Sequence, residues 1–333
     1  MNVPRNRSDA LSTDVLSPPR TQWFVDRSDR RDREGLYCHM FREDVQNRVI
    51  PYLMGREEEA FEAIFVGASD EVAIARLLLE TLSREGYRSD DREAIVDAVR
   101  AVAQALVWDN VASYEILNST STGAYGVSYI PGSTLTRLPL GALQYITNPL
   151  PTGQQRGKEK RKITWVPARS LWQVRFPRLI TTTRRYRRMM KILDKASKFA
   201  PDFWAERQDK RGAAFDWDVY RFEQHIARAA CTAAWGWPMR NSELQDITEY
   251  YYFFRDLRFE AAVATLRVHI ISELNGLLRR LNIRATIQLS GLFTPEEISG
   301  VAQQIEQGAL PFGAAIDVSR NRRRSGAGQA KES

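Results

Sequence analysis

The sequence has few of the residues on which covalent or metal-centred scaffolds depend. Cys38 and Cys231 are its only cysteines, and it has 3 histidines among 333 residues. Two cysteines form at most one disulfide, which excludes the disulfide-rich class of small domains. None of these residues has the spacing of a zinc site. We therefore expect a fold held together by its hydrophobic core, with no metal or other cofactor.

Long apolar runs are missing as well. No run approaches the ~20 residues of a membrane-spanning helix, so we expect no membrane partner. Residues 1–34 lack the apolar stretch of a secretory signal, and we expect an intracellular, reducing setting. The 19 glycines and 14 prolines show no period, which excludes a collagen-like chain. With 43% hydrophobic and 10% aromatic residues, the chain has enough core-forming side chains to fold.

Hydrophobic periodicity and turn signals predict an α+β fold that is mainly helical. The module in the middle of the chain combines strand-like pieces, turns and one long loop, whereas the regions before and after it have helical periodicity. Six segments are expected: a flexible charged arm at 1–34, a helical N-terminal region at 35–111, a β-rich module at 112–178, a basic helical segment followed by long helices at 179–281, a helical C-terminal segment at 282–319, and a basic disordered tail at 320–333.

Two helices in the front third have clear signals. One begins near Asp70 and ends near Gly86, and its inward residues are Ala75, Leu78, Leu79 and Leu82. The second begins after a capping pair, Asp90 and Glu93. Its apolar residues repeat every three or four positions, as expected for one helix face: Ile95, Val99, Val102 and Leu106.

Hydrophobic periodicity and capping signals predict three more helices in the back half of the chain. In the first, the residues expected to face one way are Phe222, Ile226, Ala229, Ala230 and Ala233. It ends at the run 235–238, Trp-Gly-Trp-Pro. A longer helix then runs from about Ile247 to Leu281, far beyond the usual three to four turns, with an apolar line at Val263, Leu266, Ile270, Leu274, Leu277 and Leu281. The last helix has a cap, a first-turn proline, a capping-box acid and a terminal glycine: Thr294, Pro295, Glu297 and Gly308.

No catalytic motif is present in the sequence. It has no phosphate-binding loop, no dinucleotide-binding glycine motif and no nucleophile elbow. The histidines are isolated, and His269 is interpreted as an ordinary helix-face residue. Cys231 lies among alanines and is interpreted as a small core residue. An enzyme with a scattered active site would gather perturbed carboxylates in a deep pocket.

Positive charge is concentrated between residues 156 and 198. The chain has a net charge of +7, and this segment holds far more positive than negative residues, so the rest is acidic. Four aromatic residues are interleaved with the charges: Trp165, Trp172, Phe176 and Tyr186. Basic and aromatic side chains together suit a phosphate backbone and its bases. The alternative interpretations are a solvated helix face or a contact with acidic neighbouring subunits.

The order of elements between about residues 102 and 316 resembles that of phage portal proteins, the head–tail connector family. Residues 105–115 look like the helix-to-strand step of that family, and residues 165–176 are similar to one of its strands. The best match is 222–238, which is similar to a family helix ending in Gly-x-Pro. Residues 273–278, within the long helix, and 294–312, the capped final helix, also resemble family segments.

The resemblance implies that the protein is not an enzyme and forms a ring, typically of twelve subunits, at one capsid vertex. Double-stranded DNA would be packaged and ejected through the ring, which would bind the terminase packaging motor, the capsid and the head–tail adaptors. The protein would reside in the virion, and in the host cytoplasm during assembly. The 112–178 module would be a wing or clip, and 282–319 would form a crown-like segment.

The resemblance also suggests site residues. Candidate DNA or tunnel contacts are Arg240, Asn241, Arg184, Arg185, Arg187 and Arg188. Candidate oligomer or tunnel-helix residues are Tyr250, Phe254, Leu266, Ile270, Leu274 and Leu277. The alternative function is a non-ring helical nucleic-acid-binding protein that uses the 156–198 basic segment.

Overall fold

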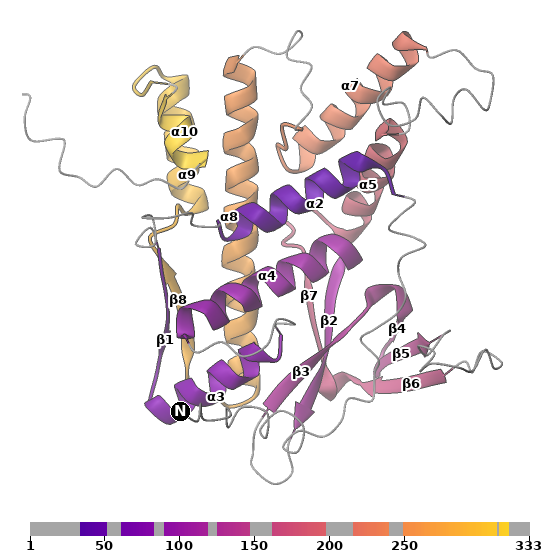
Figure 1. Cartoon of the computed structure of the whole chain (residues 1–333), viewed down its shortest axis with the longest axis vertical. Helices are drawn as coiled ribbons and strands as arrows, with labels where there is room; N and C mark the ends of the chain where they lie inside the picture. Colours follow the sequence, from indigo (N-terminus) through magenta and orange to yellow (C-terminus); the bar gives the residue numbers. More distant parts are fainter. Residues whose placement is uncertain are drawn as a thin grey trace, which may run out of the picture. The chain divides into compact units, whose positions relative to one another are not determined.

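A computed structural model describes residues 34–51, 61–82, 90–118, 125–146, 162–197, 216–239, 249–311 and 313–319. It is an α+β fold with small sheets, which confirms the predicted fold class (Figure 1). The described residues within 63–175 and 270–288 form one compact unit, called unit 1. Those within 34–62, 176–269 and 289–319 form unit 2.

The core of unit 1 lies between two helices and a three-stranded sheet. Helices α3 (Ser69–Glu80) and α4 (Asp91–Asp109) pack against each other. Helix α3 also packs against β3 (Tyr125–Ile130), and α4 packs against β2 (Val111–Asn118) and β7 (Leu171–Arg175). The sheet has the order β3-β2-β7, with β2 antiparallel to both β3 and β7. In this register Tyr114 lies opposite Tyr129 on one side and Trp172 on the other. These cross-strand aromatic contacts fix the register of the sheet.

Unit 1 has a second sheet of order β4-β5-β6, also antiparallel. Its strands are β4 (Leu135–Leu138), β5 (Gly141–Ile146) and β6 (Lys162–Pro167). A separate two-stranded sheet pairs β1 (Glu62–Val66) with β8 (Thr286–Ser290). The sequence predicted neither β1 nor β8, because each strand has only five residues and stands within a region of helical periodicity. Segments 35–111 and 282–319 are therefore not purely helical.

Unit 2 is built from helices. They are α2 (Leu36–Val49), α5 (Thr183–Ser197), α7 (Trp217–Ala234), the part of α8 (Glu249–Arg280) up to residue 269, α9 (Pro295–Glu306) and α10 (Gly313–Ser319). Phe41 of α2 is the centre of an aromatic cluster and contacts the rings of Tyr186, Trp235, Trp237 and Phe259 at centroid distances of 5.3 to 6.2 Å. Burial of this many large rings is a major part of the stabilisation of the unit.

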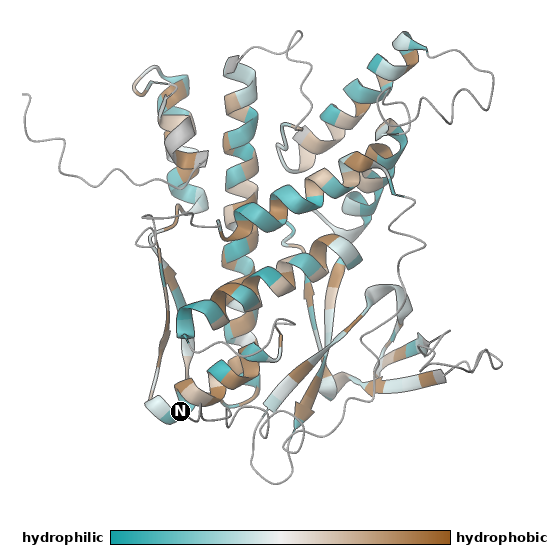
Figure 2. Cartoon of the chain, in the orientation of Figure 1, coloured by the Kyte–Doolittle hydropathy of each residue, from teal (hydrophilic) through white to brown (hydrophobic). Residues whose placement is uncertain are grey.

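The 32-residue helix α8 confirms the predicted long helix. Hydrophobic and hydrophilic bands alternate along it, as they do along α4 (Figure 2). Residues Leu257 and Ala264 of α8 form a buried cluster with Ile298 and Ile305 of α9 and with residues of α10. None of the described helices is long and apolar enough to cross a membrane.

Capping residues define the ends of several helices as predicted. The Asp90 side chain accepts a hydrogen bond from the Arg92 amide at 3.0 Å and caps α4. Thr294 and Glu297 form a reciprocal capping box at the start of α9, and Gly308 follows that helix with a φ of 71°. The predicted inward residues of α3 and α4 are buried. Gly86 lies outside the described residues.

The predicted apolar stripe of α7 does share one helix face, but that face is not the one buried in unit 2. The face that packs against α5 contains Tyr220, Glu223, Gln224, Ala227 and Cys231. The predicted apolar face is the outer one: Phe222 is 62% exposed, and Ala229 and Ala233 are also exposed. Periodicity locates an apolar stripe but cannot say whether that stripe faces its own core or another molecule.

Candidate nucleic-acid interface

Helix α5 presents a continuous basic face in unit 2. All six of its basic residues are exposed, whereas Tyr186, Met189, Met190 and Leu193 are buried on the opposite face. The basic residues are Arg184, Arg185, Arg187, Arg188, Lys191 and Lys195. With 3.6 residues per turn, all of them except Arg185 fall within about 100° of the helix circumference. Four of the predicted contact residues are therefore brought together on one helix.

Most of this positive charge is not neutralised by acidic side chains in the described ranges. Lys195 pairs with Glu223 of α7. Within the part of the chain that the structure describes, Arg184, Arg187, Arg188 and Lys191 make no ion pair. Like charges this close repel one another, and the repulsion is relieved when a polyanion binds. Their exposed side chains can also reach a partner without rearranging the fold.

The apolar face of α5 holds the helix in place through the aromatic cluster. Tyr186 lies 4.6 Å from the ring of Phe176 and 6.4 Å from that of Trp235, measured between centroids. Burial raises the pKa of the Tyr186 hydroxyl, so this side chain stays neutral at physiological pH. The buried face therefore anchors the α5 helix within unit 2, with its basic residues on the opposite, exposed face.

The C-terminal end of α5 is joined to the start of α2. The Asp194 carboxylate accepts a hydrogen bond of 2.8 Å from the Gly35 amide, and the Ser197 hydroxyl accepts one of 3.0 Å from the Tyr37 amide. A Cβ on Gly35 would lie 2.3 Å from the Ser197 Cβ, so this close approach requires glycine. The only acidic residue of α5 thus contributes to packing between helices.

The aromatic residues of the basic segment are not arranged for base stacking. Trp172, Phe176 and Tyr186 are buried in the cores, and only Trp165, at 41% exposure, reaches the surface. The predicted surface of interleaved basic and aromatic side chains was therefore wrong for three of its four aromatic residues. What remains is a charge-only face, which suits the phosphate backbone of a duplex rather than the bases of a single strand.

The other predicted DNA contacts cannot be placed. Arg240 and Asn241 lie outside the described residues, as do Arg156, Lys158, Lys160, Arg161 and Lys198 of the basic segment. The described part of that segment is also divided, because residues up to Arg175 belong to unit 1 and residues from Phe176 belong to unit 2.

The predicted tunnel-helix residues fall into two groups on α8. Leu266, Ile270, Leu274 and Leu277 are buried within the described chain and contribute to its own packing. Tyr250, by contrast, is 45% exposed and stacks on Phe254 with a centroid distance of 6.4 Å. Only the N-terminal end of α8 therefore offers aromatic surface to another molecule.

A buried ionic cluster joins α8 to α2 in unit 2. The Arg48 guanidinium donates 2.6 Å hydrogen bonds to both Asp256 and Glu260, and its Cζ lies 5.1 Å from the ring centre of Phe259. Burial raises the pKa of Glu260 to about 7, although Arg48 opposes the shift. Sequence reasoning missed this cluster; the i, i+4 spacing of Asp256 and Glu260 was its only signal.

Arg267 is a buried cation of α8. Its guanidinium donates to the carbonyl oxygens of Val49 at 3.2 Å and Phe293 at 2.6 Å. Burial lowers its pKa to about 10, so it remains charged at neutral pH. Together with Arg48, it fixes the position of α8 by directional hydrogen bonds as well as by apolar packing.

The cysteines are structural. Cys38 and Cys231 are buried free thiols, and burial raises the pKa of both, that of Cys231 to about 12. This confirms the prediction that Cys231 is a small core residue. No group of three His, Cys, Asp or Glu side chains among the described residues could hold a metal ion.

Comparison with known proteins adds no assignment. No protein-family model matches the chain, and no curated protein matches its sequence. The candidate function therefore depends on the order of the elements and on the surfaces of α5, α7 and α8.

Proposed function

We propose that this chain is the subunit of a portal-like ring through which double-stranded DNA is packaged and ejected. The observation that carries the proposal is the order α7, 235–238 turn, 32-residue α8 and capped α9. This order is the one that resembles the portal family in sequence. The protein would act as a structural conduit rather than an enzyme, in the virion and, during assembly, in the host cytoplasm.

Two surfaces of unit 2 support the proposal. The outer face of α7 exposes Val219 and Phe222 together with small alanines, a stripe that a neighbouring subunit would cover. The basic face of α5 supplies positive charge that no described acidic side chain neutralises, apart from the pair at Lys195. A conduit requires DNA to slide, and contacts to phosphates alone position a duplex without stopping it at particular sequences.

The partners follow from this role. A ring at a capsid vertex would bind the terminase packaging motor during filling and head–tail adaptors afterwards. Twelve subunits is the expected number. The wing or clip would be formed by the strands within 112–178, and the crown by the segment from β8 to α10.

The first test is the particle mass of the purified chain in solution, measured by light scattering after size exclusion and checked by negative-stain images. We expect a ring of about twelve subunits with a central hole. Because such rings can require a scaffold, the measurement is repeated after co-expression with a capsid and scaffolding set. A 38.2 kDa monomer under both conditions would contradict the proposal.

The unpaired cations of α5 favour a second candidate function, a non-ring protein that binds nucleic acid through this helix. Replacing Arg184, Arg187 and Arg188 with serine tests it. If these residues contact phosphates, duplex affinity falls and the slope of log K against log salt decreases by about 2 to 3.

The matched control replaces two exposed arginines of unit 2 outside α5, Arg221 and Arg258, with serine. Their loss is expected to change duplex affinity far less than the loss of the α5 arginines. A monomer with steep, α5-dependent duplex binding would establish the second function in place of the first. A ring whose DNA binding is weak and insensitive to sequence would support the first.

A further inference from the structure

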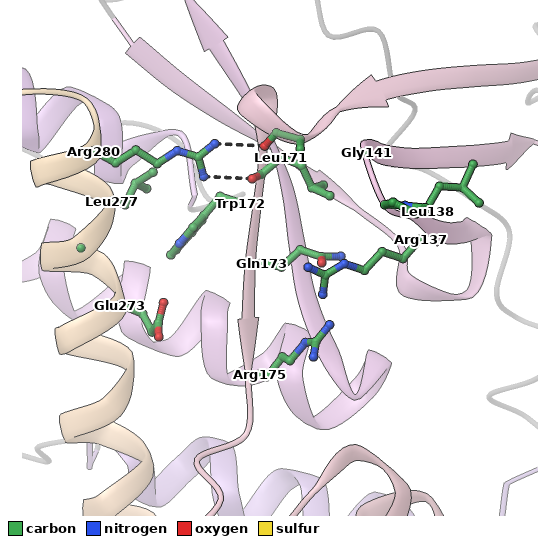
Figure 3. A pocket seen from close by; sticks show the side chains of 13 residues that line it. Arg137, Leu138, Gly141, Leu171, Trp172, Gln173, Arg175, Glu273, Leu277 and Arg280 are labelled. Carbon is green, nitrogen blue, oxygen red and sulfur yellow. Dashed lines mark hydrogen bonds between the residues drawn. The ribbon is translucent and has the colours of Figure 1, made fainter.

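A hollow of about 550 Å³ lies in unit 1, bordered by β4, the β4–β5 turn, β7 and the last turns of α8 (Figure 3). We call it the arginine pocket, because Arg137, Arg175 and Arg280 all line it. They come from β4, β7 and α8, so tertiary folding alone brings them together. The volume is in the range of small-molecule sites and far exceeds that of a single inorganic ion.

Arg280 forms a fixed wall of the arginine pocket. Its guanidinium donates hydrogen bonds to the carbonyl oxygens of Leu171 at 3.0 Å, Ala168 at 3.1 Å and Arg169 at 2.7 Å. Carbonyl groups satisfy its N–H groups but do not neutralise its charge. The wall is therefore rigid and remains positive.

Arg137 and Arg175 lie on the strand side of the hollow (Figure 3). Both are exposed, and Arg137 makes no hydrogen bond or ion pair with any residue in the described ranges. A guanidinium presents a planar fork of N–H donors that matches the two oxygens of a carboxylate or phosphate. Three arginines around one hollow repel one another, and an anion between them relieves this repulsion.

The rest of the lining is acidic, apolar or amide in character, unlike the lining of a site for a single inorganic ion. Glu273 stands on the α8 side, away from Arg137 and Arg175 (Figure 3). Leu171 and Leu277 add apolar surface. Gln173 is held by a 3.0 Å hydrogen bond from its Nε2 to the Ser113 hydroxyl. Arg137 and Arg175 thus stand on the strand side, whereas Arg280 and the one carboxylate of the lining, Glu273, come from α8.

We propose that the arginine pocket binds a small organic anion. Its phosphate or carboxylate group lies between Arg137 and Arg175, its body lies against the leucines, and a hydrogen-bond donor of the body faces Glu273. A nucleoside monophosphate has all three features and is the simplest probe. The site lies wholly within unit 1, does not depend on a ring, and is separate from the basic face of α5.

The experiment is calorimetric titration of the full chain with AMP, citrate and inorganic phosphate. We expect at least one organic anion to bind more tightly than inorganic phosphate. Arg137→Ala is expected to weaken that binding at least tenfold, and Arg137→Lys several-fold because the fork is lost. Arg279→Ala is the matched control, an exposed arginine of α8 outside the pocket lining, and leaves binding unchanged.

Two further variants test whether the body of the ligand, the part beyond its anionic group, occupies the pocket. A Cβ added to Gly276, which lines the pocket, meets no atom within 4 Å, so Gly276→Ala is accommodated and reduces the free volume. It is expected to weaken binding of the organic anion more than that of inorganic phosphate, without lowering the melting temperature. Glu273→Gln is expected to weaken the binding of AMP more than the binding of citrate, because citrate has fewer hydrogen-bond donors.

The proposal is overturned if none of the three anions binds at up to about 10 mM, a concentration that detects even very weak sites. Binding that survives Arg137→Ala or is equally reduced by Arg279→Ala also overturns it, since either result indicates general attraction to a basic protein. Failure here leaves the ring proposal intact, because particle mass and duplex binding are measured separately.

Discussion

Gly236, which follows α7, has a backbone conformation that side chains rarely adopt. Its φ is 77°, and an added Cβ would lie 2.5 Å from the Arg258 Cβ and 2.9 Å from the Phe259 amide nitrogen. We therefore expect Gly236→Ala to lower the free energy of unfolding by about 1 to 3 kcal/mol. Urea denaturation measures this.

The matched control for that variant is Gly300→Ala. Gly300 lies within α9, and a Cβ there meets no atom within 4 Å. Alanine at this position is expected to raise the free energy of unfolding by about 0.5 to 1 kcal/mol, since it restricts the unfolded chain and favours the helix. Equal effects of the two substitutions would contradict the conformational argument.

Glu260 makes the stability of unit 2 depend on pH. Its pKa is about 7 in the folded chain and near the ordinary 4.5 when unfolded, so the folded state binds more protons between these values. Stability that is fully present below pH 4.5 is then lost as the pH rises to 7. Relative to Glu260→Gln, the natural chain is expected to lose about 1 to 3 kcal/mol over this range.

The measurement is urea denaturation of the natural chain and of Glu260→Gln, each at pH 5 and pH 8. The variant serves as the reference because it cannot ionise, while the other titrating groups remain the same in both. An exposed control on α9, Glu306→Gln, is expected to show no such pH-dependent difference. A stability difference between the natural chain and Glu260→Gln that is the same at the two pH values would contradict this interpretation.

At the scale of elements, α7 and α8 present apolar residues to different surroundings. Leu274 of α8 is fully buried, so Leu274→Ala leaves a cavity and is expected to cost about 2 to 4 kcal/mol. Phe222 of α7 is 62% exposed, so Phe222→Ser is expected to change monomer stability by about 0.5 kcal/mol or less. Thermal unfolding of the two variants distinguishes core residues from surface residues.

If α7 lies between subunits, Phe222→Asp interferes with assembly but not with folding. A charged group within an apolar contact loses its hydration without gaining a partner. We expect the particle mass to fall while the circular dichroism spectrum and melting temperature of the dissociated chain stay close to those of the natural protein. A ring of unchanged mass and stability would remove this face of α7 from the interface.

At the scale of the whole molecule, assembly and DNA binding should respond differently to salt. The proposed contacts between subunits are apolar, and apolar association is not weakened by salt. Contacts between α5 and phosphates depend on counterion release and weaken steeply with salt. Between about 50 and 500 mM salt we expect a constant particle mass and a large loss of DNA affinity. A ring that dissociates over this range would indicate that ion pairs hold it together.

Periodicity and capping predicted the helices well, because these signals act within a few residues. Asp90 and Thr294 were assigned as caps from sequence, and both are caps in the structure. The five-residue strands β1 and β8 were missed because they pair with each other across more than two hundred residues. Periodicity did not indicate which way the α7 stripe faces, because the buried face of that helix includes the polar residues Glu223 and Gln224.

The sequence by itself determined the α+β class, the long helix, the helix caps and the concentration of positive charge between residues 156 and 198. These features depend on local spacing, and each is encoded within a single segment. Only the tertiary structure decided that Leu274 and Leu277 belong to the core, that three of the four aromatic residues of the basic segment are buried, and that Arg137, Arg175 and Arg280 surround one hollow. Burial and convergence depend on residues far apart in the chain, and no local pattern specifies which distant surface will cover a side chain.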